Sequence, residues 1–123
     1  MPEQNVVSTS STAEWRAWLA EHGRSETEAW LVIPHKNSGV PGVTYAEAVE
    51  QALCFGWIDG LQRRHDEHSA RLRFTPRRPK SKWSAPNRER VERMIREGLM
   101  TEHGRAAVER AQTDGTWDPE KSG

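Results

Sequence analysis

The stretch that decides the fold is residues 52–84, which reads ALCFGWIDGLQRRHDEHSARLRFTPRRPKSKWS. Over 69–75, a leucine and a phenylalanine alternate with two arginines. This period of two predicts a strand with one apolar and one cationic face. Residues 57–61 are predicted to form a strand or a turn, which makes the polar residues 65–68 a hairpin loop between two chain segments. Two antiparallel strands are therefore expected at the centre of the chain.

Helices are predicted on both sides of this hairpin by capping residues. Ser11 and Thr44 are each followed three residues later by glutamate, which is the spacing of a capping box. A glycine follows each helical pattern, as is typical of a helix end. We therefore expect four helices, lying between Ser11 and Gly23, Thr44 and Gly56, Ser84 and Gly98, and Thr101 and Gly115.

One more strand is predicted over 28–34, an apolar run that ends at a proline. The expected order is therefore helix, strand, helix, strand, strand, helix, helix. This order favours an α+β fold in which a small antiparallel sheet packs against about four helices in a single domain. Polar residues 1–10 and 118–123 are expected to be flexible tails, and residues 11–117 to form the domain.

Composition limits the class of protein further. The chain has 123 residues, of which 34% are hydrophobic, and its mean hydropathy is −0.90. It has no apolar run of about 18 residues, so no transmembrane helix is expected, and its N-terminus lacks the pattern of a secretory signal. The single cysteine, Cys54, cannot form an internal disulfide. We therefore expect a cytoplasmic protein.

The net charge of zero conceals a strong asymmetry along the chain. Residues 61–96 contain twelve arginines and lysines against four acids, a net charge of +8, and the rest of the chain carries −8. A basic band on a neutral protein attracts anions locally. Three aromatic residues, Trp57, Phe74 and Trp83, lie in or next to this band.

Several motifs in the chain resemble the YdeI/OmpD-associated family of bacterial proteins. The resemblance is carried by ALCFGWIDG at 52–60 and by RFTPRRPKSKWS at 73–84, and it extends over roughly residues 15–117. It implies a link to bacteriocin protection and antimicrobial tolerance. It implies neither a reaction nor a set of catalytic residues.

Aromatic faces beside guanidinium groups are suited to a flat or anionic ligand. We therefore expect a binding site for a small anionic or aromatic molecule, or a peptide, without a metal or other cofactor. The alternative is that the aromatic residues belong to the core and the cations form a solvated rim. The predicted ligand-binding residues are Trp57, Asp59, Arg71, Arg73, Phe74, Arg77, Lys80, Ser81 and Trp83.

Three other functions are considered. Weak nucleic-acid contact would use the phosphate-binding capacity of segment 61–96. An enzyme of unknown reaction would use Asp59 as a base or Cys54 as a nucleophile, although Asp59 is followed by a turn glycine and Cys54 lies near a helix C-terminus. His65 and His68 are too few for a structural zinc site, so a solvated turn is favoured there.

Overall fold

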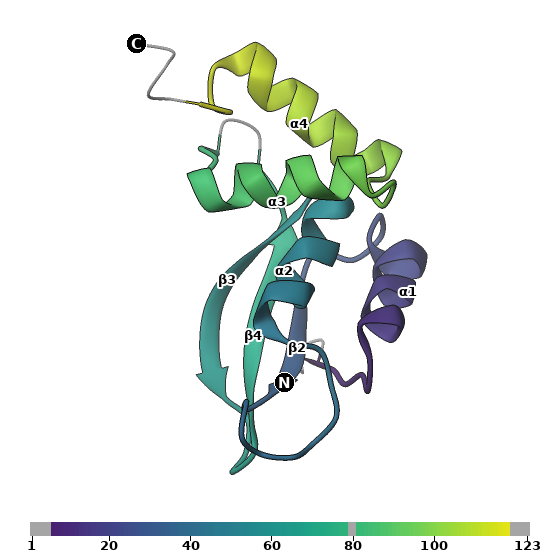
Figure 1. Cartoon of the computed structure of the whole chain (residues 1–123), viewed down its shortest axis with the longest axis vertical. Coiled ribbons are helices and arrows are strands. Elements are labelled where there is room, and N and C mark those ends of the chain that lie inside the picture. Colours follow the sequence, from purple (N-terminus) through teal and green to yellow (C-terminus); the bar gives the residue numbers. More distant parts are fainter. Residues whose placement is uncertain (1–5, 79–80, 119–123) are drawn as a thin grey trace.

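Four strands form one mixed sheet in the order β1-β2-β4-β3 in a computed structural model that describes residues 6–78 and 81–118 (Figure 1). The strands β2–β4 and β3–β4 pair antiparallel, whereas β1 runs parallel to β2. The strands are β1 (Val6–Val7), β2 (Ala29–Pro34), β3 (Trp57–Arg64) and β4 (Ser69–Pro76). The helices are α1 (Thr12–His22), α2 (Tyr45–Cys54), α3 (Ala85–Arg96) and α4 (Glu102–Asp114).

The predicted α+β class is confirmed, and the predicted tail at residues 1–10 needs revision. Val6 and Val7 pair with Trp30 and Leu31, and Val7 is buried in the core. A strand of two residues shows no period in the sequence, so only its pairing with β2 reveals it. Residues 1–5 and 119–123 lie outside the described residues.

Each helix begins at the predicted capping residue. The side-chain oxygens of Ser11, Thr44, Ser84 and Thr101 all accept a hydrogen bond from a backbone N–H in the first turn. At Thr44 the capping box is complete, because the Glu47 carboxylate also accepts from the Thr44 backbone N–H. Local side-chain chemistry thus sets where the helices start.

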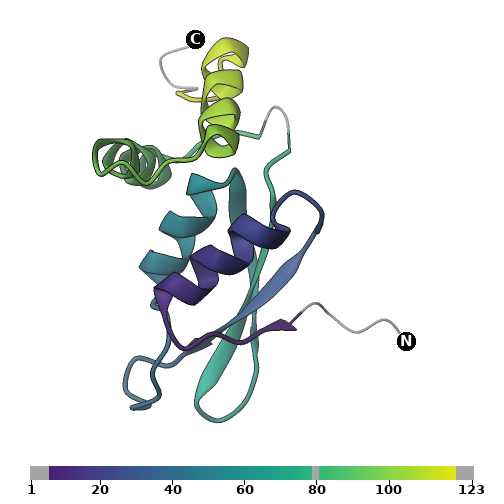
Figure 2. The same cartoon turned by 90° about the vertical axis from the view of Figure 1, so that its right-hand side faces the viewer.

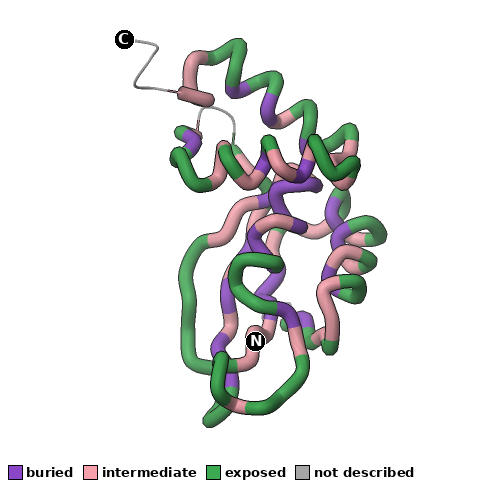
Figure 3. The backbone as a smooth tube through the Cα atoms, viewed as in Figure 1, coloured by how far each residue is buried: buried purple, intermediate pink, exposed green. Residues whose placement is uncertain are grey.

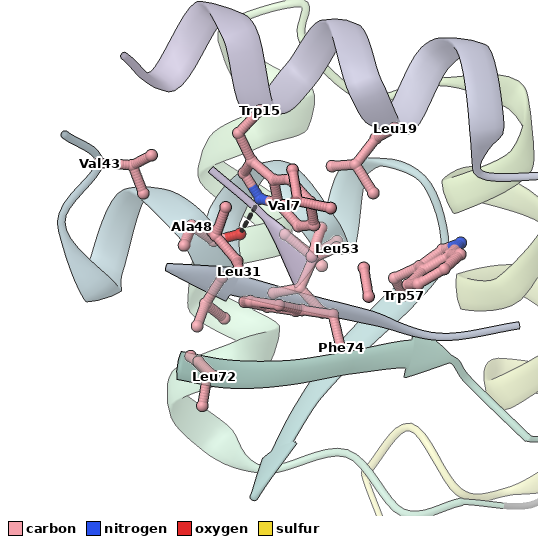
Figure 4. Close-up of a cluster of buried hydrophobic side chains, with 14 of the residues drawn as sticks. Val7, Trp15, Leu19, Leu31, Val43, Ala48, Leu53, Trp57, Leu72 and Phe74 are labelled. Carbon is pink, nitrogen blue, oxygen red and sulfur yellow. Dashed lines mark hydrogen bonds between the residues drawn. The ribbon is translucent and has the colours of Figure 1, made fainter. Parts of the chain in front are cut away.

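Two helices cover one face of the sheet. Figure 2 shows α1 and α2 side by side against that face, with α3 and α4 at one end of the sheet. Between these layers lies the core, in which Trp15 and Leu19 of α1 meet Leu31 of β2 and Phe74 of β4 (Figure 4). The indole Nε1 of Trp15 donates to the carbonyl of Ala48, at 3.0 Å, so this buried polar atom is satisfied.

The outer part of the sheet is much more exposed. Residues 60–68, in β3 and the hairpin loop, are all exposed, which Figure 3 shows as a long green segment at one edge. In β4, Leu72 and Phe74 face the helices, and Arg71 and Arg73 lie on the opposite face with Trp30. The predicted apolar and cationic faces of this strand are confirmed.

Close backbone packing joins α4 to the end of α2. The Cys54 carbonyl accepts hydrogen bonds from the backbone N–H and the hydroxyl of Thr101. A Cβ atom on Gly104 would lie 2.3 Å from the same carbonyl oxygen, so only glycine permits this approach. No helix in the described part of the chain is long and apolar enough to cross a membrane.

Candidate functional site

The three aromatic residues of the predicted site are buried in the core. The exposed fractions of Trp57, Phe74 and Trp83 are 1%, 0% and 4%. Trp57 donates its indole N–H to the Gly23 carbonyl at 3.0 Å, and Trp83 packs against Trp117 with their ring centres 5.0 Å apart. These rings stabilise the fold and have almost no surface to offer a ligand.

The predicted cations lie in two different places. Arg71 and Arg73 lie on the face of the sheet opposite Leu72 and Phe74, where Arg73 Nε donates to the Glu28 carboxylate at 2.8 Å. Arg77 lies beyond the end of β4, with its guanidinium carbon 3.8 Å from the centre of the Trp83 ring. The predicted site therefore does not form a single hollow in the described residues.

Of the remaining predicted residues, Ser81 lies beside Arg77 and lines a shallow depression with Arg77 and Trp83, whereas Asp59 contacts Tyr45. Asp59 accepts a hydrogen bond from the hydroxyl of Tyr45 at 2.8 Å, on the helix-covered side of the sheet. Ser81 donates its hydroxyl to the Arg78 carbonyl and closes a local turn. Lys80 lies outside the described residues.

A larger hollow lies elsewhere, between the loop 35–44 and the sheet. Its volume is about 680 Å³. Ile33, Ala70 and Leu72 from β2 and β4 contribute apolar lining, and the loop contributes Val40 and Val43. Apolar pockets of this size with a few polar groups are typical small-molecule sites. We call this hollow the loop cavity.

Polar and cationic groups line the same cavity. They are His35, Lys36, Thr44, Tyr45 and Gln62, contributed by the loop, the start of α2 and β3. No aspartate or glutamate of the described residues lines it. The cavity therefore combines apolar surface with positive charge, which is the combination expected for an organic anion.

Hydrogen bonds and close packing hold the loop that forms one wall of the cavity. The His35 backbone N–H donates to the His68 carbonyl at 2.7 Å, which ties the start of the loop to the β-hairpin. Ser38 accepts from the Val40 backbone N–H at 3.1 Å. Gly42 lies against Pro34, where a Cβ atom would come within 2.5 Å of the proline ring. Val43 is 1% exposed and anchors the end of the loop in the core.

Two large apolar side chains remain exposed beside this cavity. Val40 is 48% exposed and Tyr45 is 46% exposed, and both line it. Partial burial of the phenol, with the hydrogen bond to Asp59 as the next cause, raises the pKa of Tyr45 above its ordinary value of 10.0. Tyr45 therefore stays protonated at neutral pH and presents a neutral aromatic ring to the cavity.

The alternative catalytic residues have different environments. Cys54 is fully buried, and this burial raises the pKa of its thiol, which disfavours the thiolate needed for nucleophilic attack. The carboxylate that Asp59 would use as a base instead accepts a hydrogen bond from the Tyr45 hydroxyl, which is part of the protein and not a substrate. Among residues 6–78 and 81–118, no three His, Cys, Asp or Glu side chains come together as a metal site would require.

The cations of α3 are largely used within the molecule. Arg93 pairs with Glu50 and lies 3.7 Å from Glu97. Arg88 donates to the carbonyls of Trp83 and Trp117, at 3.1 Å each. These contacts give the basic helix a structural role at the end of the sheet.

Sequence reasoning missed the loop cavity because its residues are far apart in the chain. The one local signal was the loop itself, where glycine and proline flank the apolar Val40. The sequence does not reveal that this valine and Tyr45 would be left exposed beside Leu72. Only the folding of the loop onto the hairpin brings them together.

Residues 7–107 match a family described as a domain of unknown function, DUF8412. The chain belongs to the DUF8412 family. No curated protein and no solved structure shows a significant match to it. The matched DUF8412 region contains every residue that lines the loop cavity, so this cavity is part of the family domain. The resemblance to the YdeI/OmpD-associated family stays a prediction.

Proposed function

We propose that this chain is a small cytoplasmic binding protein that holds an organic anion with an aromatic or other apolar body, or a short peptide of that character. The observation that carries the proposal is the loop cavity, with its apolar lining, the cation Lys36, the imidazole of His35, and no carboxylate among its described lining residues. In a cell, sequestration of such a molecule would contribute to antimicrobial or stress tolerance, as the YdeI/OmpD-associated resemblance implies.

The apolar part of the ligand would contact Val40, the Tyr45 ring and Leu72. Burying the exposed part of Val40 and Tyr45 removes apolar surface from water, which favours binding in proportion to the area covered. The anionic group would lie near Lys36, whose ammonium group is a flexible point charge. The apolar surface thus supplies affinity, and the cation selects ligands by charge.

Anilinonaphthalene sulfonate is a suitable first probe because it combines aromatic rings with one anionic group. We expect saturable fluorescence enhancement with one site per chain while the near-ultraviolet circular dichroism remains native. The spectrum is essential because this dye also binds partly folded states. A screen of amphipathic carboxylates by thermal shift would then identify tighter ligands, since binding to the native state raises the melting temperature.

Matched variants locate the site. Val40→Ser removes apolar surface from the cavity and is expected to weaken dye binding by about three- to tenfold. Leu61→Ser is the control, because Leu61 is 57% exposed and does not line the cavity. Lys36→Gln is likewise expected to weaken dye binding. Its control is Lys82→Gln, which changes an exposed lysine away from the cavity. Equal losses in a variant and its control, or no saturable binding to the wild type, would reject the proposal.

A further inference from the structure

A second hollow, separate from the loop cavity, lies between α4 and the chain that leaves β4. Its volume is about 130 Å³, and Arg77, His103 and Arg110 are among its lining residues. No carboxylate side chain is among its described lining residues. Arg77 and Arg110 also line an adjacent shallow depression together with Arg78. Three arginines and one histidine thus line two adjoining hollows.

Arg77 is the most informative member of this group. Its Nη2 donates to the carbonyls of Ser81 at 3.3 Å and Lys82 at 3.1 Å, and its guanidinium lies on the Trp83 ring. Within the described residues it makes no ion pair within 4.0 Å, although the charge of Asp59 acts on it from farther away. A half-buried guanidinium without a close counter-ion is costly, and a bound anion would supply one.

His103 is a further lining residue of this hollow. Its Nδ1 lies 3.5 Å from Nη2 of Arg24, so the guanidinium of Arg24 also lies close to this group of side chains.

We propose that Arg77 and Arg110, next to His103, form a binding site for a phosphate-class oxyanion, such as inorganic phosphate or a phosphate monoester. Donors arriving from two guanidinium groups match a tetrahedral anion with several oxygens, whereas a planar carboxylate is satisfied by one guanidinium fork. The small volume accommodates the anionic group alone, so the rest of a larger ligand would extend over the exposed Arg78 and Arg110. This site is independent of the loop cavity.

Titration with inorganic phosphate at constant ionic strength tests the proposal directly. The readout is the ¹H–¹⁵N spectrum, including the Nε–H resonance of Arg77, and constant ionic strength removes general screening effects. We expect saturable shifts of Arg77 and of α4 backbone resonances around residues 103–110. Absence of saturable shifts at tens of millimolar phosphate, or shifts spread evenly over all arginines, would overturn the proposal.

Arg110→Gln is the decisive variant, because Arg110 is exposed and its replacement leaves the core intact. It is expected to weaken phosphate binding about tenfold, the loss of one charge-assisted hydrogen bond. Arg105→Gln is the control, since Arg105 is an exposed arginine on the same helix that does not line the hollow. If both variants bind equally well or equally poorly, the assignment of the site is wrong.

The source of the phosphate is determined by a second pair of probes. A phosphate monoester and a twelve-nucleotide single strand are titrated against the wild type and Arg110→Gln. Tighter binding of the strand that is lost with Arg110 identifies a nucleic-acid backbone as the source, whereas binding no tighter than the monoester identifies a small phosphorylated molecule. Strand binding that Arg110→Gln leaves unchanged would contradict the site.

Discussion

The guanidinium carbon of Arg77 lies 3.8 Å from the centre of the Trp83 ring, and this contact packs together the two ends of the segment that connects β4 to α3. The indole is 4% exposed, so the cation covers an aromatic face that would otherwise be open to water. Burial also lowers the pKa of the Arg77 guanidinium to about 10. The contact joins two residues of the predicted binding site, Arg77 and Trp83, and contributes to the stability of the fold.

Replacing Arg77 by alanine is expected to lower the free energy of unfolding by about 2 kcal/mol. The loss combines a cation–π contact, worth about 0.5 to 2 kcal/mol, with two hydrogen bonds to backbone carbonyls. Urea denaturation measures the change. Arg78→Ala is the control, because Arg78 is exposed and its loss should change stability by no more than about 0.5 kcal/mol. Equal effects of the two substitutions would show that the stack contributes nothing.

Tyr45 is the only tyrosine in the chain, so ultraviolet absorbance of tyrosinate reports its titration alone. We expect an apparent pKa above 10.0, because burial and the hydrogen bond to Asp59 both favour the neutral phenol. Asp59→Asn should lower this pKa, since it removes the negative charge beside the ring. Asp66→Asn, in the distant hairpin loop, should leave it unchanged. A wild-type midpoint at or below 10.0 while the protein is folded would contradict the geometry.

The same pKa shift links Tyr45 to stability. Because the folded-state pKa lies above the unfolded value, the folded state holds the proton more tightly, and the stabilisation is complete below about pH 10. It is lost as the pH rises from there through the folded-state pKa. The difference in unfolding free energy between wild type and Tyr45→Phe should therefore become less favourable to the wild type above pH 10.

Gly104→Ala provides a test in which helix propensity predicts a gain in stability and tertiary packing predicts a loss. Within a helix, alanine is more favourable than glycine by about 1 kcal/mol. In this fold the new Cβ atom would lie 2.3 Å from the Cys54 carbonyl oxygen, so α4 must shift. We expect a net destabilisation of about 1 to 3 kcal/mol, as for other overpacked sites. The control is Gln112→Ala, at an exposed position on the same helix, which should be neutral or slightly stabilising. A gain in stability for Gly104→Ala would refute the close packing.

Cys54 should be unreactive in the native protein. It is fully buried and its thiol pKa is raised by burial, so both access and thiolate formation are disfavoured. Ellman's reagent should report almost no thiol under native conditions at pH 8 and one equivalent per chain in guanidinium chloride. Rapid native reaction would restore Cys54 as a candidate nucleophile.

The sequence by itself determined the helices, the hairpin and the α+β class. Each helix starts at a capping side chain that accepts a hydrogen bond from a backbone N–H three residues later, so each start depends on local sequence alone. The capping residues are Ser11, Thr44, Ser84 and Thr101. The alternation in β4 likewise places Leu72 and Phe74 on one apolar face because successive strand residues point to opposite faces. Such signals are local and can be read without knowing the fold.

Only the tertiary structure decided where the functional surfaces lie. Trp83 becomes core because Trp117 and Arg77 close over it, and Arg77 lies beyond the end of the strand that carries Arg71 and Arg73. The loop cavity exists because the segment that contains Val40 folds back onto β2 and β4. These outcomes depend on contacts between residues far apart in the chain. Neither composition nor period encodes them, because the same aromatic and cationic residues serve equally well in a core or in a binding site.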